Sequence, residues 1–226
     1  MANPFRIGFL LYPHVTQLDL TGPAQFLARM SDTTIHLVWK SLDPVLTDAG
    51  FKIVPTDTFD ACPDLDMVCV PGGAGQLILM RDPEVLAWLK RQGEQSAYVT
   101  SVCSGSLILG AAGLLSGYRA GAHWAYRDKL ELFGATPVAE RVVKDRNRIT
   151  GGGVTAGIDF ALTVIDAVRG SDEAKAIQLA YEYAPLPPFD SGTPDRAAPD
   201  TIARALAILQ AMGAEAASYA SEASAS

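Results

Sequence analysis

The residue whose neighbours best suit it to covalent chemistry is Cys103. It follows a short β-branched run at 98–102 and precedes small residues and a long apolar run at 107–112. This pattern predicts a buried strand that turns sharply into a buried helix, with the side chain of Cys103 at the corner. A cysteine at a helix start lies near the positive end of the dipole, which favours the reactive thiolate. The alternative is a buried cysteine that packs as a small apolar side chain.

Two other features follow predicted strands and could assist a nucleophile. Asp19 lies between two leucines, where partial desolvation would raise its pKa and make the protonated acid available near neutral pH. Gly72 and Gly73 follow another strand, and the backbone amides of Gly73 and Ser104 are candidates to stabilise negative charge on the reacting atom. Alternatively, Asp19 is a helix-start residue that accepts backbone hydrogen bonds, and the two glycines form an ordinary tight turn.

The other cysteines and the histidines are weaker candidates. Cys62, Cys69 and Cys103 lack the spacing of a disulfide framework or a zinc site. His123 is the only plausible base for Cys103, but packing against Trp124 is the favoured interpretation. A glycine run at 151–153 lacks the lysine of a P-loop. We therefore expect no metal ion, no nucleotide and no other cofactor.

The segments that must position these residues alternate between strands and helices. This order predicts an α/β fold with a mostly parallel sheet and helices on both faces, and Asp19, Gly73 and Cys103 then converge at the carboxyl ends of its strands. One domain is expected over 1–188. A C-terminal extension at 189–226 is expected to form one amphipathic helix, with Ile202, Leu206 and Leu209 on one face, and a frayed Ala/Ser tail. The expected strands are 7–11, 35–39, 67–70, 98–102, 142–143 and 148–150, with an edge hairpin between 44 and 55 and helices at 18–29, 82–92, 123–133, 155–168 and 172–183, the last capped by Ser171.

Composition limits the classes of function. The chain has 226 residues, 49% of them hydrophobic and 19% charged, so one sizeable core is expected. Its formal net charge is −7 and it has no basic run, which disfavours binding to nucleic acid or to an anionic membrane. No apolar run approaches the roughly 18 residues of a membrane span, and the N-terminal segment lacks a signal-peptide core. We expect a cytoplasmic protein.

Five motifs in order resemble those of the ThiJ/PfpI superfamily. They are LDLTGP at 18–23, VPGG at 70–73, TSVCSGS at 100–106, HW at 123–124 and TGGGVTAGID at 150–159. The resemblance covers roughly residues 5 to 185 and implies a flavodoxin-like, glutamine-amidotransferase-like fold with a nucleophile elbow after a central strand. Within the superfamily the motifs are most similar to those of the isocyanide (isonitrile) hydratases, hydro-lyases that add water to an isocyanide to give an N-substituted formamide.

The resemblance also implies roles for individual residues. Cys103 matches the nucleophile, which would form a covalent thioimidate. Asp19 matches the general acid/base, in place of the glutamate of many relatives. The amides of Gly73 and Ser104 match the anion-stabilising positions. A homodimer is implied as well. Gly72, Thr21 and Val154 are expected to line the substrate pocket.

Departures from the superfamily pattern narrow the activity. Ser104 stands where the peptidases of the superfamily carry histidine, and many isocyanide hydratases carry threonine there. The acidic, Ala-rich C-terminal segment disfavours a DNA-binding regulator. Two alternatives stay open. One is a glyoxalase-like or other cysteine-dependent activity, which generally uses a glutamate and a nearby histidine. The other is a non-catalytic redox sensor based on an oxidisable Cys103.

Overall fold

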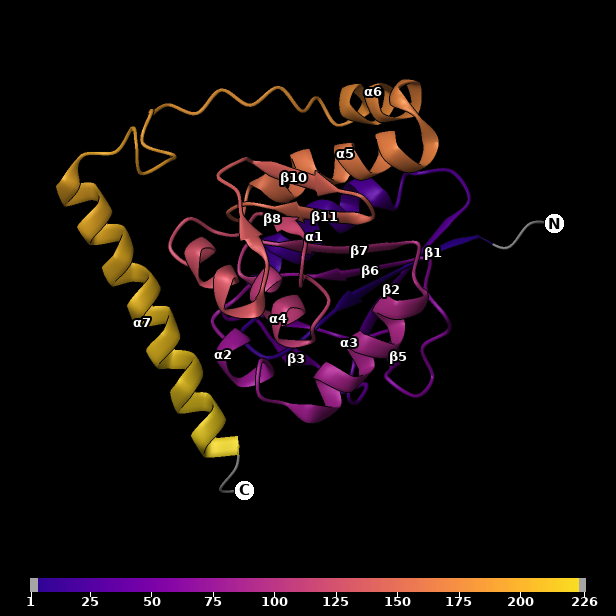
Figure 1. Ribbon diagram of the computed structural model, residues 1–226, viewed down its shortest axis with the longest axis horizontal. Helices are drawn as coiled ribbons and strands as arrows, with labels where there is room; N and C mark the ends of the chain where they lie inside the picture. The colour runs from indigo at the N-terminus through magenta and orange to yellow at the C-terminus, as the bar shows by residue number, and fades with distance from the viewer. Residues whose placement is uncertain (1–3, 224–226) are drawn as a thin grey trace.

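The fold is built around one twisted sheet, shown in Figure 1. The computed structural model describes residues 4–223. Within that range seven strands pair in the order β10-β11-β7-β6-β1-β2-β5, all parallel except the β10–β11 pair. The predicted mostly parallel sheet is therefore confirmed. The strands are β1 (Phe5–Leu10), β2 (Thr33–Trp39), β5 (Asp57–Thr58), β6 (Met67–Val70), β7 (Tyr98–Val102), β10 (Val142–Asp145) and β11 (Arg148–Gly151).

Helices cover both faces of this sheet. On one face α1 packs against α5 and α5 against α6, while α3 and α4 pack over β6 and β7 on the other. Strand β6 is buried along its whole length because it lies between these layers, which explains its continuous apolar sequence. The helices are α1 (Gln17–Leu27), α2 (Gln76–Leu79), α3 (Pro83–Gln95), α4 (Gly105–Ala111), α5 (Ala156–Arg169), α6 (Ser171–Ala180) and α7 (Pro199–Ala223).

Three local predictions need correction. The hairpin between residues 44 and 55 forms, but β3 (Val45–Leu46) and β4 (Lys52–Ile53) make a separate two-stranded sheet, and β5 takes the edge of the main one. The segment after His123 is the 3₁₀ helix η1 (Arg127–Phe133). Ser171 does not cap α6, because its hydroxyl donates to Asp166 instead. A second small sheet pairs β8 (Arg119–Ala120) with β9 (Thr136–Pro137).

Helix α7 lies along one side of the body, and a long extended segment connects it to α6 (Figure 1). Its sequence includes most of the Ala/Ser-rich stretch that was expected to fray, while residues 224–226 lie outside the described range. Of the residues expected to share one face of this helix, Leu209 is partly buried while Leu206 is 45% exposed. No helix within residues 4–223 has both the length and the apolar composition needed to cross a membrane.

Candidate active site

Cys103 occupies a sharp corner between β7 and α4. Its φ of +59° places it in the left-handed region that non-glycine residues seldom adopt. Its backbone N–H donates to the carbonyl oxygens of Gly151 (3.1 Å) and Gly152 (2.8 Å), so the end of β11 holds the corner in place. Gly105 follows, and a Cβ there would overlap the carbonyl oxygen of Val70. Strand β6 therefore passes very close to the start of α4, and only glycine fits at this position.

Asp19 lies in the first turn of α1 and has no exposed surface. Its Oδ2 accepts a hydrogen bond from the backbone N–H of Gly72 at 2.9 Å. A Cβ on Gly72 would lie 2.7 Å from Oδ2 of Asp19, 2.7 Å from the amide nitrogen of Ser104 and 2.8 Å from Cβ of Cys103. Gly72 is thus surrounded by these three residues, and any side chain at this position would push them apart. The structure brings Asp19, Gly72, Cys103 and Ser104 together.

The Asp19 carboxyl and the Cys103 thiol share a buried site. Burial raises the pKa of Asp19 to about 7, although its contacts with Cys103 and Gly72 act in the opposite direction. The predicted rise in the Asp19 pKa is confirmed. Burial and the nearby Asp19 charge also raise the pKa of the Cys103 thiol well above its usual value. The predicted stabilisation of the thiolate is therefore wrong for the resting site, because these effects exceed the opposing contribution of the Ser104 amide.

Gly73 and Ser104 place hydrogen-bond donors near the sulfur of Cys103. The N–H of Gly73 donates to the Ser104 hydroxyl oxygen at 3.1 Å. The Ser104 hydroxyl uses its oxygen to accept this bond, and its O–H proton can donate to negative charge near Cys103. The Ser104 amide also faces the Cys103 sulfur and lowers the thiol pKa. Ser104 thus offers two donors, its amide N–H and its O–H. The amide N–H of Gly73 is already bonded to the Ser104 hydroxyl oxygen.

A cavity of about 240 Å³ opens over Cys103 and Ser104. Much of its wall is apolar, with contributions from Leu77, Leu107 and Val154. Of the three residues expected in the substrate pocket, Val154 lines this cavity and Gly72 lies behind it, against Asp19 and Cys103. Thr21 is not among the lining residues, and its hydroxyl donates to Gln17 one turn earlier in α1.

His123 lines the cavity but does not bond to the sulfur. Its Nδ1 accepts a hydrogen bond from the backbone N–H of Ala125 at 3.3 Å, and its ring packs beside Trp124 and Tyr126. Burial lowers its pKa, which favours the neutral imidazole. Among the hydrogen bonds of residues 4–223, none joins the His123 ring to Cys103. The contact with Trp124 agrees with the packing interpretation.

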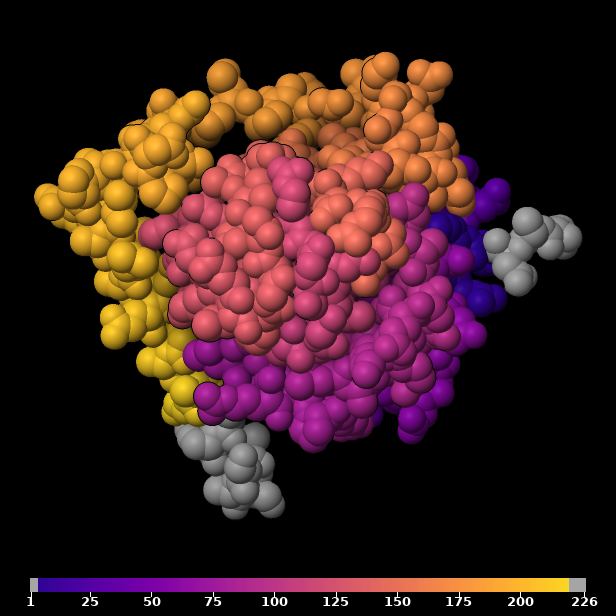
Figure 2. All heavy atoms as spheres, viewed as in Figure 1, coloured from indigo at the N-terminus to yellow at the C-terminus, as the bar shows by residue number. Residues whose placement is uncertain are grey.

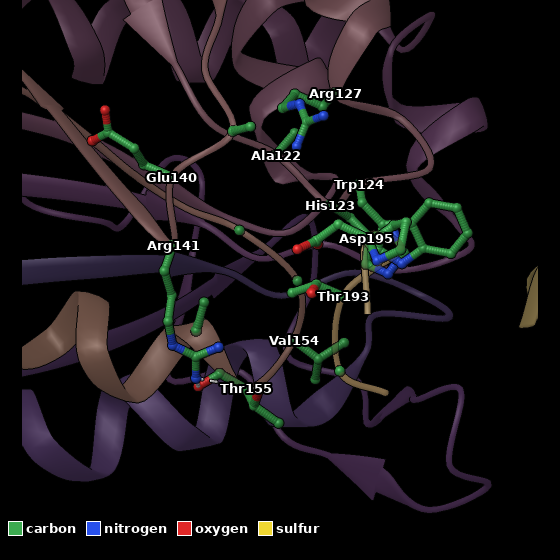
Figure 3. A pocket seen from close by; sticks show the side chains of 16 residues that line it. Ala122, His123, Trp124, Arg127, Glu140, Arg141, Val154, Thr155, Thr193 and Asp195 are labelled. Carbon is green, nitrogen blue, oxygen red and sulfur yellow. Dashed lines mark hydrogen bonds between the residues drawn. The ribbon is translucent and has the colours of Figure 1, made fainter. Parts of the chain in front are cut away.

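A second, larger cavity adjoins the first and shares His123 and Val154 with it (Figure 3). Its volume is about 660 Å³, and it lies between the body and the extended segment at 192–195. Charged side chains line it, among them Arg127, Arg141 and Asp195. This cavity holds none of the predicted nucleophile, acid or amide residues.

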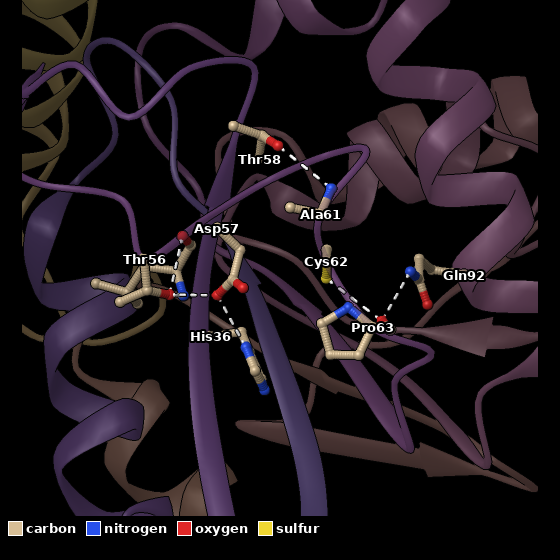
Figure 4. Close-up of polar contacts among 9 residues, drawn as sticks. His36, Thr56, Asp57, Thr58, Ala61, Cys62, Pro63 and Gln92 are labelled. Carbon is tan, nitrogen blue, oxygen red and sulfur yellow. Dashed lines mark hydrogen bonds and ion pairs between the residues drawn. The ribbon is translucent and has the colours of Figure 1, made fainter.

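The remaining cysteines are poorly suited to reaction. Cys62 lies near Pro63, whose carbonyl oxygen accepts a bond from its sulfur at 3.5 Å, in a region that also contains the His36–Asp57 pair (Figure 4). Burial raises the pKa of Cys62 to about 12, and that of Cys69 likewise to about 12. Neither thiol forms appreciable thiolate at neutral pH. Residues 4–223 contain no group of three or more metal-ligating side chains.

Sequence reasoning missed two contributors to the cavity wall. Gln76 of α2 is almost fully buried, and its Oε1 has no hydrogen-bond partner among the described residues. Helix α7 contributes Leu209, Met212 and Gly213. The spacing of Leu209, Met212 and Ala216 was the available signal for this inward face, but sequence alone does not show which surface such a face will cover.

Known proteins resemble this chain in sequence and in structure. An isonitrile hydratase of Pseudomonas putida is 58% identical over 192 residues, which cover 85% of this chain and 84% of that enzyme. The HTH-type transcriptional regulator GbdR of Pseudomonas aeruginosa is 32% identical over 80% of this chain and 51% of the regulator.

The structural likeness extends over nearly the whole chain. A THiJ/PfpI family protein from Pseudomonas syringae superposes with a TM-score of 0.89 at 46% identity, covering 94% of this chain and 89% of that one. DJ-1beta of Drosophila melanogaster shares the fold, with a TM-score of 0.73 at 20% identity, covering 80% of this chain and all of that one. The model of the DJ-1/PfpI family matches residues 5–167, more than half of the sequence. The chain therefore belongs to the DJ-1/PfpI family.

Proposed function

We propose that this protein is a cysteine-dependent hydro-lyase that adds water to isocyanides and releases N-substituted formamides. The observation that carries the proposal is Cys103 at the floor of a largely apolar cavity, with the buried carboxyl of Asp19 against it. The 58% identity to an isonitrile hydratase supports the choice of substrate class. An isocyanide offers one electrophilic carbon and an apolar R group, which suits a site with one nucleophile and largely apolar walls.

The first step joins the sulfur of Cys103 to the terminal carbon of R–N≡C. With a pKa of about 7, Asp19 is about half ionised at neutral pH, so its carboxylate can accept the thiol proton as the S–C bond forms. The protonated Asp19 then delivers that proton to the same carbon, giving the thioimidate R–N=CH–S–Cys. The raised thiol pKa is compatible with this sequence because the thiolate need exist only during attack.

The second step adds water to the thioimidate carbon. Asp19 takes a proton from the water as the C–O bond forms and passes that same proton to the imine nitrogen, giving R–NH–CH(OH)–S–Cys and leaving Asp19 ionised. Collapse of this adduct breaks the C–S bond, releases R–NH–CHO and returns the proton to the sulfur. The amide and hydroxyl of Ser104 face this position and can stabilise negative charge on the departing sulfur.

The proposal is tested with Cys103→Ala, Asp19→Asn and the control Cys62→Ala, assayed for formamide release from cyclohexyl isocyanide. We expect a loss of at least a thousandfold for Cys103→Ala, at least a hundredfold for Asp19→Asn and little change for Cys62→Ala. Intact-mass measurement during turnover should show a substrate adduct on Cys103. Near wild-type turnover by Cys103→Ala or Asp19→Asn would contradict the mechanism, and turnover of methylglyoxal without turnover of isocyanide would favour a glyoxalase. The homodimer and the cytoplasmic location remain predictions, and sedimentation of the purified protein tests the first.

A further inference from the structure

Helix α7 reaches the reactive cavity from outside the sheet domain. Leu209, Met212 and Gly213 line the same cavity as Cys103, although more than one hundred positions separate them in sequence. Met212 and Gly213 lie three and four residues after Leu209, so both neighbour Leu209 on one side of the helix. Ala216 continues that face and is 2% exposed. The face that α7 turns toward the body is therefore the face that closes the cavity opposite the nucleophile.

Contacts near its C-terminal end hold α7 in this position. The ring of Tyr219 lies edge-on against His14, with ring centroids 4.8 Å apart. His14 belongs to the loop after β1, and its carbonyl oxygen accepts the N–H of Gly75, close to the cavity-lining residues Gly73 and Ala74. The anchor of α7 thus adjoins the cavity itself. Figure 2 shows the yellow helix lying along one side of the body rather than projecting from it.

Gly213 is unusual because neither its conformation nor its neighbours require glycine. It lies inside α7 and has no positive φ, and a Cβ at this position would meet no atom within 4 Å. Gly72, by contrast, has no room for a Cβ. Glycine is the least favourable residue for a helix interior apart from proline. A side chain at position 213 therefore has open space around it, and Gly213 is one of the residues that line the cavity.

We infer that Met212 and Gly213 determine which isocyanides the enzyme accepts, by setting how large an R group fits between α7 and Cys103. This inference rests on the proposed function and adds the substrate class: isocyanides with one compact apolar R group, such as a single ring. The cavity of about 240 Å³ supports that size. An apolar cavity of about 150 Å³ holds a benzene molecule, so this one has room for a ring and the isocyano group.

Selectivity is measured as the ratio of kcat/KM for cyclohexyl isocyanide to kcat/KM for ethyl isocyanide. Gly213→Leu adds a branched side chain at the cavity wall, and we expect it to lower this ratio at least tenfold. Met212→Ala enlarges the cavity, and its effect is measured with the bulkier adamantyl isocyanide. We expect this variant to raise the ratio of kcat/KM for adamantyl isocyanide to kcat/KM for ethyl isocyanide at least threefold. Ala214→Leu is the matched control, because Ala214 is the next residue of α7 and is exposed. Its ratio should equal that of the wild type.

A second measurement separates this inference from the proposed function. The rates at which iodoacetamide and the bulkier iodoacetanilide alkylate Cys103 are followed by mass spectrometry, which requires no turnover. Gly213→Leu should slow iodoacetanilide at least tenfold more than iodoacetamide, and Ala214→Leu should not. If the wild type hydrates no isocyanide, the proposed function fails. The ratio of the two alkylation rates still shows whether residue 213 limits the size of a molecule that can reach Cys103. Unchanged ratios in a folded Gly213→Leu variant, or equal changes in Ala214→Leu, would overturn the inference.

Discussion

At the scale of single residues, the chemistry depends on two acidic groups that share one buried site. Asp19 and Cys103 cannot both ionise cheaply, because burial raises the pKa of each group and the charge of Asp19 raises the pKa of the Cys103 thiol further. The resting pair therefore carries at most one negative charge near neutral pH. A proton that is held in this way can move from sulfur to carboxylate and on to the substrate without leaving the site.

The raised pKa of Asp19 makes a prediction about stability. A carboxyl whose pKa is about 7 in the folded chain and 3.8 in the unfolded chain destabilises the fold as pH rises from about 4 to 7. At about 1.4 kcal/mol per pKa unit, the penalty is on the order of 4 kcal/mol at pH 8 and falls below about 1 kcal/mol at pH 4. Asp19→Asn keeps an oxygen for the Gly72 N–H and removes the charge. Its free energy of unfolding in urea should exceed that of the wild type at pH 8 but not at pH 4. Parallel pH profiles would contradict the assignment.

At the scale of secondary-structure elements, the site depends on how closely β6, β7 and α4 approach one another. The positive φ of Cys103 lifts its side chain toward the cavity while its N–H remains bonded to the end of β11. Gly105 lets the carbonyl end of β6 lie directly against the start of α4. A similar close contact joins α1 to α5, where a Cβ on Gly157 would lie 3.1 Å from Pro23. These contacts fix the relative positions of Asp19 and Cys103, which belong to different elements.

Two glycine-to-alanine substitutions should therefore have opposite effects. Gly105→Ala forces the new methyl group into the Val70 carbonyl, and we expect a loss of about 2 kcal/mol or more in stability. Gly213→Ala adds a methyl group in open space inside a helix, and we expect a gain of up to about 1 kcal/mol. Thermal and urea unfolding of both variants measure these changes. Equal stabilities for Gly105→Ala and the wild type would argue against the close approach of β6 and α4.

At the scale of the whole molecule, the cavity is closed by a segment that the sheet domain does not need for its own core. The stretch between α6 and α7 is exposed along most of its length and makes few backbone hydrogen bonds. Helix α7 nevertheless covers Cys103 through the face that includes Leu209 and Met212. The sheet domain therefore carries the reactive groups, while α7 completes the space around the substrate.

Proteolysis tests this division. Proteinase K should cut the native chain first within 184–198, because that backbone is exposed and sparsely bonded. Cys103 in the cut chain, once freed of α7, should react faster with iodoacetanilide than in the intact chain. Mass spectrometry of the fragments locates the first cut. An initial cut inside the body would contradict the expected weakness of the connecting segment, and an unchanged alkylation rate after release of α7 would show that α7 does not close the cavity.

Sequence patterns alone determined much of this arrangement. Continuous apolar runs such as 67–70 predicted buried parallel strands, and the parallel sheet placed Asp19, Gly73 and Cys103 at one edge because its strand ends meet there. The motifs also identified the family correctly. These inferences succeeded because strand burial, turn glycines and helix starts are local properties of the chain.

Only the tertiary structure decided the ionisation of the site and the outer wall of the cavity. The sequence placed Cys103 at a helix start and so predicted a thiolate, but its pKa depends on burial and on Asp19, eighty-four positions away. Which face of α7 points inward likewise depends on the surface that the helix meets. In the structure Met212 and Ala216 face the body, while Leu206 is exposed. Both properties arise from groups distant in sequence, because desolvation and packing depend on neighbours in space.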